Sequence, residues 1–239
     1  MAARSWFARA HMPMEVILKV TYGIAQGWKF DQIILEASDL PDGTILFPET
    51  VTDWYNYGRE VMDAALTRRY QARGLMGGAG EVVEIDESKI GHMKYYRGRR
   101  VDGQWILGLI NRTTGEMRVD IVPDRAAVTL LPIIQRHVAP NTTIMSDEWA
   151  AYQGLPNVNN YTHLTVNHTV NFVNPVTGAH TQRIESNWRA LKARVCRGGV
   201  RRMNLHRHIA EYLWRRECLI DNGDTFKQLI QDISVSFRV

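Results

Sequence analysis

The sequence predicts an α/β protein in which a small all-α domain precedes a mixed sheet flanked by helices. In roughly the first seventy residues, apolar side chains recur at helical spacing, and a glycine-rich stretch follows at residues 73–80. Beyond it, short strand-like runs give way to a strand, helix, strand alternation, which is typical of a sheet covered by helices. The 239 residues, 45% of them hydrophobic, suffice for one large domain and a small one.

Residues 1–72 are expected to form three helices. Pro13 opens the first, which ends at Gly27, the second covers Lys29–Ala37, and Pro48 opens a long third helix. Three such helices suit a helix-turn-helix unit whose third helix reads a DNA groove. A plain helical bundle gives the same pattern. The connection before Pro48 is also longer than the three or four residues usual in that motif.

Residues 73–80 are interpreted as a linker, residues 81–223 as the domain that contains the sheet, and residues 224–239 as a C-terminal helix and tail. Strands are predicted at Glu81–Ile90, Trp105–Ile110, Met117–Val122 and Thr142–Met145, with a helix at Arg125–Val138. Two further helices are expected at about 181–192 and 204–218. In the first strand, Val83 and Ile85 face one way, and Glu84 and Asp86 face the other.

Three carboxylates stand at positions that suggest a divalent-metal site. Asp86 and Asp147 each end an apolar strand, and Glu185 lies on a later helix whose apolar stripe would pack on a core. Carboxylates held close together repel one another unless a cation neutralises them, and hard oxygen ligands select Mg²⁺ or Mn²⁺. Each acid also has a structural interpretation: Asp147 as a helix cap, Asp86 as a turn former, and Glu185 as the partner of Arg189.

Basic residues are concentrated in two places. Residues 91–100 contain two tyrosines and the cations Lys94, Arg97, Arg99 and Arg100, a composition that suits a loop gripping a phosphate backbone. An ordinary solvated hairpin tip would look the same. Between Arg183 and Arg216, ten arginines and lysines stand against two glutamates. This excess, with a net charge of +4 and a pI near 9.1, points to a polyanionic partner.

The composition also excludes several classes of protein. The two cysteines, Cys196 and Cys218, argue against a disulfide scaffold and cannot form a four-cysteine zinc ribbon. No apolar run is long enough for a membrane span or a secretory signal. A reducing compartment and no membrane partner are therefore expected.

Four blocks of the sequence resemble the ISXO2-like (IS1595/Merlin) transposase domain. They are Val83–Ser88, Met145–Tyr152, Val166–His168 and His180–Lys192, in that order. The resemblance implies an RNase H-like fold and a catalytic, metal-binding triad of Asp86, Asp147 and Glu185. It also implies that Lys192 and Arg189 contact DNA phosphates and that His168 lies near the metals. A structural histidine bonded to a carbonyl is an equal alternative for His168.

The function expected from this resemblance is that of a DDE transposase. Such an enzyme cleaves transposon DNA ends and transfers the strand into target DNA, using two Mg²⁺ (or Mn²⁺) ions. It is expected to work as a homo-oligomer, and the Merlin-like pattern favours a nuclear setting over a bacterial nucleoid. Members of the family often carry an N-terminal zinc ribbon, which these cysteines cannot supply. The alternative is therefore a domesticated DNA-binding protein without strand transfer, and a structure-selective nuclease is a third reading.

Overall fold

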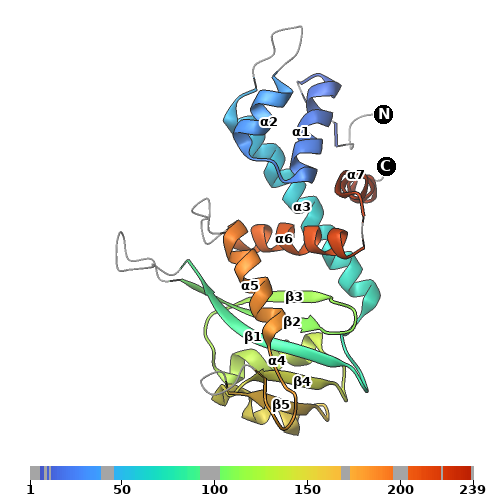
Figure 1. The fold of residues 1–239 in the computed structure, drawn as a ribbon. Helices are drawn as coiled ribbons and strands as arrows, with labels where there is room; N and C mark the ends of the chain where they lie inside the picture. The colour runs from blue at the N-terminus through green and yellow to red at the C-terminus, as the bar shows by residue number, and fades with distance from the viewer. Residues whose placement is uncertain are drawn as a thin grey trace, which may run out of the picture. The chain divides into compact units, whose positions relative to one another are not determined.

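The computed structural model describes residues 6–7, 10, 12–38, 46–91, 103–167, 173–195, 204–221 and 223–237. The chain divides into two compact units, Met1–Arg69 with Ala210–Val239, and Tyr70–Ile209 (Figure 1). The domain boundaries predicted from the sequence, at 1–72, 73–80, 81–223 and 224–239, stay a prediction. No helix in the described part of the chain is long and apolar enough to cross a membrane.

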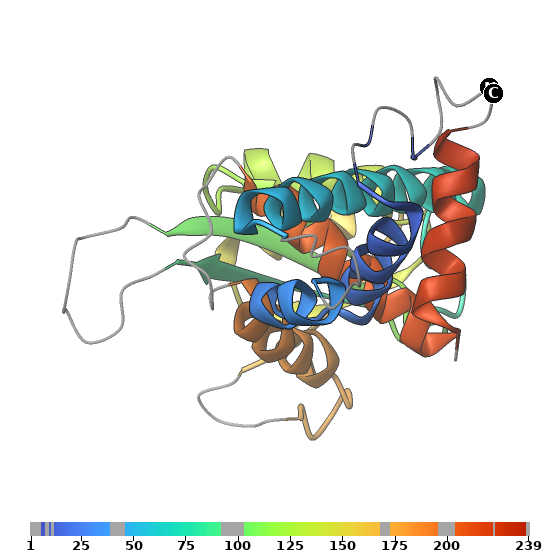
Figure 2. The same cartoon turned by 90° about the horizontal axis from the view of Figure 1, so that it is seen from above.

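The first unit is entirely helical. Its elements are α1 (Met14–Gln26), α2 (Phe30–Ala37), most of α3 (Pro48–Arg73), most of α6 (Leu205–Ile220) and α7 (Thr225–Ser236). The three N-terminal helices confirm the predicted ones, and α7 lies beside α1 (Figure 2). A buried ion pair between Arg59 and Glu211, 2.9 Å apart, joins α3 to α6 within this unit. The use of α3 as a groove-reading helix stays a prediction.

The second unit contains a five-stranded mixed sheet. Its strands are β1 (Val82–Ile90), β2 (Gln104–Asn111), β3 (Met117–Val122), β4 (Thr143–Asp147) and β5 (Thr162–Val166). The spatial order is β3-β2-β1-β4-β5: the first three strands pair antiparallel, and β4 and β5 are added in parallel. This is an RNase H-like sheet, as predicted. Strand β5 was not predicted from the sequence.

Helices cover both faces of this sheet. On one face, α4 (Ala127–His137) and the short 3-10 helix η1 (Ala150–Asn157) pack over Val83 and Ile85 of β1. On the other, α5 (Gln182–Val195) crosses β1 and β2 and lies against Glu84 and Asp86. The predicted alternation of side chains along β1 is therefore confirmed, and it decides which acids face α5.

The glycine-rich segment before β1 packs against the sheet unit. The backbone of Met76 exchanges hydrogen bonds with His137 and Ala139, and its side chain is buried. Gly77 has a φ of +87°, and a Cβ there would lie 2.6 Å from the Thr142 hydroxyl oxygen. Glycine is required at this position both for its backbone conformation and for this close approach.

The start of α5 is held by a buried carboxylate from the sheet. Glu84 is 0% exposed, and its Oε2 accepts hydrogen bonds from the backbone N–H groups of Arg183 (3.0 Å) and Ile184 (3.1 Å). Its Oε1 accepts from Arg112 Nε at 2.7 Å. A helix N-terminus has unpaired N–H donors and a partial positive charge, so a carboxylate is a favourable partner there. Glu84 thus performs for α5 the task that a local N-cap side chain usually performs.

Glu84→Gln should lower the free energy of unfolding by about 3 kcal/mol, because it leaves the half-buried Arg112 without its counter-charge. Urea titration followed by circular dichroism measures the loss. The control is Arg136→Gln, which breaks an ion pair whose arginine side chain is 61% exposed, and should change stability by less than about 1 kcal/mol. Equal effects of the two substitutions would contradict the role assigned to Glu84.

Candidate metal centre

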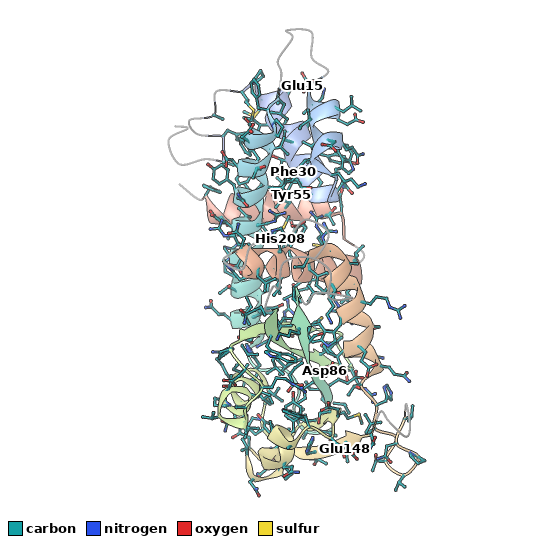
Figure 3. All side chains as sticks on the ribbon, turned by 90° about the vertical axis from the view of Figure 1, so that its left-hand side faces the viewer. Glu15, Phe30, Tyr55, Asp86, Glu148 and His208 are labelled. Carbon is teal, nitrogen blue, oxygen red and sulfur yellow. The ribbon has the colours of Figure 1, made fainter. Side chains whose placement is uncertain are left out.

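Two of the predicted catalytic acids lie together at the sheet. Asp86 is on β1 and Asp147 ends β4, which runs parallel to β1 as its neighbour. One carboxylate oxygen from each, and one from Glu87, all lie within 4.8 Å of one another. Among the described residues, these three form the group of acids able to share a cation. Figure 3 shows Asp86 on the sheet and Glu148, which directly follows Asp147, in the same unit.

The Asp86 side chain is oriented by Trp188, whose ring occupies the space left by the missing side chain of Gly108 on β2. Trp188 on α5 donates a hydrogen bond from Nε1 to Asp86 Oδ2 at 2.8 Å. Its ring lies over Gly108, the residue directly opposite Asp86 on β2. A Cβ at Gly108 would stand 2.3 Å from the far edge of the ring, so only glycine leaves room for it. The predicted apolar stripe of α5 therefore orients a carboxylate of the acid group as well as packing on the core.

The surroundings of Asp86 disfavour its charged form. Burial raises the pKa of the Asp86 carboxyl to about 7, and the nearby carboxylates of Glu87 and Asp147 act in the same direction. The hydrogen bond from Trp188 opposes the shift without cancelling it. An aspartate in this condition binds a proton readily at neutral pH, and a divalent cation would relieve the same repulsion. The electrostatics thus fit a site that is completed by a cation.

Glu87 belongs to this acid group although the sequence reading did not select it. It is buried on the α4 face, where Arg125 Nη2 donates to its Oε2 at 3.3 Å. Burial raises the pKa of Glu87, while Tyr152 and Arg125 act to lower it. The pKa of the buried Tyr152 hydroxyl is raised well above 10, by burial first and then by the Glu87 carboxylate. The position of Glu87 immediately after Asp86, on the same strand, is the signal that could have identified it.

Glu185 lies on the first turn of α5 but outside the group of three acids. Its side chain is exposed, and Oε1 accepts a hydrogen bond from the Thr181 hydroxyl at 2.8 Å. Further along α5, Arg189 is exposed and Lys192 is half-buried. The assignment of Glu185 as the third metal ligand, and of Arg189 and Lys192 as DNA contacts, stays a prediction.

Five predicted DNA-contacting residues fall outside the described part of the chain. They are Lys94, Arg97, Arg99 and Arg100, in the segment 92–102, and His168, in the segment 168–172. Their assigned roles stay predictions from the sequence.

The donor set fits a hard divalent cation. Mg²⁺ and Mn²⁺ prefer carboxylate oxygens, and Asp86, Glu87 and Asp147 together offer only such ligands. A zinc site would be expected to include histidine or cysteine. Asp86 and Asp147 are the residues best placed to hold the ion, because they lie on neighbouring parallel strands, Asp86 within β1 and Asp147 at the end of β4. The prediction that Asp86 ends its strand is wrong, since β1 continues to Ile90. Glu87 is a third candidate ligand, restrained by its contact with Arg125.

Comparison with known proteins identifies the family. Residues 77–217 match the model of the ISXO2-like transposase domain, and the chain belongs to this family. Among solved structures, the magnesium complex of the HTLV-2 integrase catalytic core in its dimeric form is similar at 14% identity and a TM-score of 0.38, covering 59% of this chain and 88% of that one. The BIV integrase catalytic core is similar at 14% identity and a TM-score of 0.39, covering 66% and 98%. No curated protein matches the chain.

Gly108→Ala should displace the Trp188 ring and lower the free energy of unfolding by about 3 kcal/mol, since the added methyl group overlaps the ring. Combining it with Trp188→Phe, which shortens the ring, should recover part of the loss in a double-mutant cycle. Gly154→Ala is the control, because its Cβ would meet only the end of the Leu131 side chain at 3.2 Å. A Gly108→Ala protein as stable as the Gly154→Ala protein would disprove the close fit.

Asp86→Asn should stabilise the metal-free protein, and by an amount that depends on pH. The folded-state pKa of about 7 exceeds the ordinary aspartate value of 3.8, so folding favours the protonated acid, and the stability that the proton contributes is lost as pH rises between these values. The gain should be under about 1 kcal/mol at pH 4 and about 4 kcal/mol above pH 7, because the pKa differs by about 3 between the two states and each unit is worth about 1.4 kcal/mol. Thermal unfolding from pH 4 to 8, in EDTA, measures it.

Added Mg²⁺ should reverse this order above pH 7, raising the melting temperature of the unmodified chain more than that of Asp86→Asn. If the gain from Asp86→Asn did not vary with pH, ionisation of the Asp86 carboxyl would not lower the free energy of unfolding, and the prediction would be wrong.

Proposed function

We propose that this chain is a DDE transposase that cuts transposon DNA ends and joins the strand to target DNA, using Mg²⁺ or Mn²⁺. The observation that supports this most is the pair formed by Asp86 and Asp147 on neighbouring parallel strands, within the segment that matches the transposase family. Carboxylates at these positions, with a raised Asp86 pKa, suit a site for metal-dependent phosphoryl transfer.

Asp86, Asp147 and Glu185 are proposed to hold two ions. When bound, such ions lower the pKa of the attacking water or 3′-hydroxyl and stabilise the charge on the attacking and leaving oxygens. Trp188 keeps Asp86 turned toward Asp147, and the backbone N–H of Trp149 donates to Asp147 Oδ1 at 3.0 Å. For Glu185 to act as a ligand, one of its carboxylate oxygens must approach Asp86 and Asp147, while its Oε1 now accepts a hydrogen bond from the Thr181 hydroxyl.

The cations on and after α5 are proposed to hold the DNA backbone. Arg189 and Lys192 follow Glu185 at four and seven residues, so they share its side of the helix. We extend the same role to Lys94, Arg97, Arg99 and Arg100 and, beside the metals, to His168. Contacts of this kind position DNA without reading its sequence, so binding should weaken steeply as salt is added.

We further propose that the chain works as a homo-oligomer on paired DNA ends and, in a eukaryotic host, in the nucleus. The family assignment supports an assembly on DNA, since a strand transferase must bring together the transposon ends and the target. Sedimentation of the chain with and without end DNA tests this part of the proposal.

Asp86→Asn, Asp147→Asn and Glu185→Gln should each reduce Mg²⁺-dependent strand cleavage and transfer about 100-fold or more, because each removes a charge that holds a metal ion. DNA binding should change by only a few-fold. The control is Glu148→Gln, which removes an exposed carboxylate beside Asp147 and should leave activity nearly unchanged. A strand-transfer assay on end DNA measures all four variants.

Full activity in Asp86→Asn or Glu185→Gln would refute the assigned triad. Binding that persists in EDTA, falls with salt and never leads to cleavage would instead establish a domesticated DNA-binding protein. Cleavage without joining would identify a structure-selective nuclease. These three results are mutually exclusive, so the same assay decides among them.

A further inference from the structure

A cluster of cations and aromatic rings lies beside the acid group. The ammonium of Lys89 stands 5.4 Å from the centroid of the Trp105 ring, its partner across β1 and β2. The guanidinium carbon of Arg125 is 4.9 Å from the same ring and 4.1 Å from the centroid of Trp149. We call these four residues the stacking cluster. Arg125 connects its two rings, and Trp149 is its exposed member.

Trp149 is held in place from three directions. Its backbone N–H donates to Asp147 Oδ1 at 3.0 Å, and its indole Nε1 donates to the carbonyl oxygen of Arg125 at 3.0 Å. The Arg125 guanidinium covers the ring and also donates to Glu87 Oε2 at 3.3 Å. The position of the ring is therefore fixed relative to two of the three acids.

This fixed ring remains open to solvent. Trp149 is 39% exposed although its N–H groups are bonded and Arg125 lies against it, so aromatic carbon accounts for much of the exposed surface. Single exposed apolar residues are common on proteins. Here, however, two hydrogen bonds and a cation–π contact hold Trp149, which follows Asp147 by two residues in the sequence.

We infer that Trp149 is a stacking platform for an unpaired nucleobase of the DNA strand at the acid group. The inference rests on the proposed function, which brings that strand to Asp86 and Asp147. A base is the part of a nucleotide that suits this position, because its flat aromatic face stacks on an exposed ring, while the reacting phosphate is proposed to lie at the ions held by Asp86 and Asp147. Aromatic rings stack on any base, and the contact requires an open base face, which a base inside a paired duplex lacks.

The test places 2-aminopurine at an unpaired end position of the DNA and follows its fluorescence on binding. All chains carry Asp86→Asn, and the buffer contains EDTA, so that no cleavage occurs. Quenching is expected with Trp149 and with Trp149→Phe, which keeps a ring, and not with Trp149→Ala or with Trp149→Leu, which keeps apolar bulk alone. Trp149→Ala should also raise the Kd for the unpaired end by about 5- to 150-fold, and that for a fully paired duplex much less.

Val128→Ala is the matched control, because Val128 is exposed on α4 near Arg125 and should leave quenching unchanged. Equal quenching with Trp149→Leu and with Trp149 would overturn the inference. So would a change in self-association caused by Trp149→Ala with quenching intact, which would assign the ring to a contact between copies. Quenching that depends on residue 149, together with an unmodified chain that never cuts DNA in Mg²⁺, contradicts the proposed function alone. An unmodified chain that cuts in Mg²⁺, while quenching in the Asp86→Asn background is indifferent to residue 149, contradicts only this inference.

Discussion

The buried carboxylate of Glu84 is the interaction on which the arrangement of the site depends. It joins β1 to the first turn of α5, and both of its oxygens accept hydrogen bonds from buried or half-buried donors. Because Glu84 and Asp86 point to the same face of β1, fixing the start of α5 over Glu84 also brings Trp188 over Asp86. The absence of a side chain at Gly108 leaves room for the Trp188 ring, whose Nε1 donates to the Asp86 carboxylate. Strand β1 thus anchors α5 through Glu84 and presents Asp86 to the acid group that it forms with Glu87 and Asp147.

The same strand also explains why the site disfavours charge. Asp86 faces α5 and Glu87 faces α4, so burial on both faces removes water from two consecutive carboxyl groups, and Asp147 adds a third from β4. Protein groups offer only partial compensation, through the Trp188 N–H on one face and Arg125 on the other. Folding therefore produces a local excess of negative charge that a proton or a metal ion can balance.

Much of this arrangement follows from the sequence, because it depends on periodicity. The alternation along β1 correctly separated Val83 and Ile85 from Glu84 and Asp86, and the strand, helix, strand order correctly led to a mixed sheet covered by helices. Strand β5 was missed because its residues, Thr162 to Leu164 in particular, lie exposed or half-buried at a sheet edge, where apolar alternation is weak. Glu87 was missed because alternation places it on the face opposite Asp86, and only the structure shows that one of its oxygens lies within 4.8 Å of an oxygen of Asp86 and of Asp147. The Glu185–Thr181 hydrogen bond depends on a side-chain rotamer, which spacing does not determine.

The net charge of the acid group, without and with bound DNA, indicates how many divalent ions the site needs for neutrality. When all three acids are ionised, Asp86, Glu87 and Asp147 together with the guanidinium of Arg125 leave an excess of about two negative charges, which one divalent ion would balance. Under the proposed function, a DNA phosphate and the carboxylate of Glu185 each add about one more, and this second excess calls for a second ion. The contact between Glu185 and Thr181 then has a simple electrostatic reason: without the phosphate and its cation, a fourth carboxylate would only increase the repulsion at the site, and a hydroxyl on its own helix turn is the better partner.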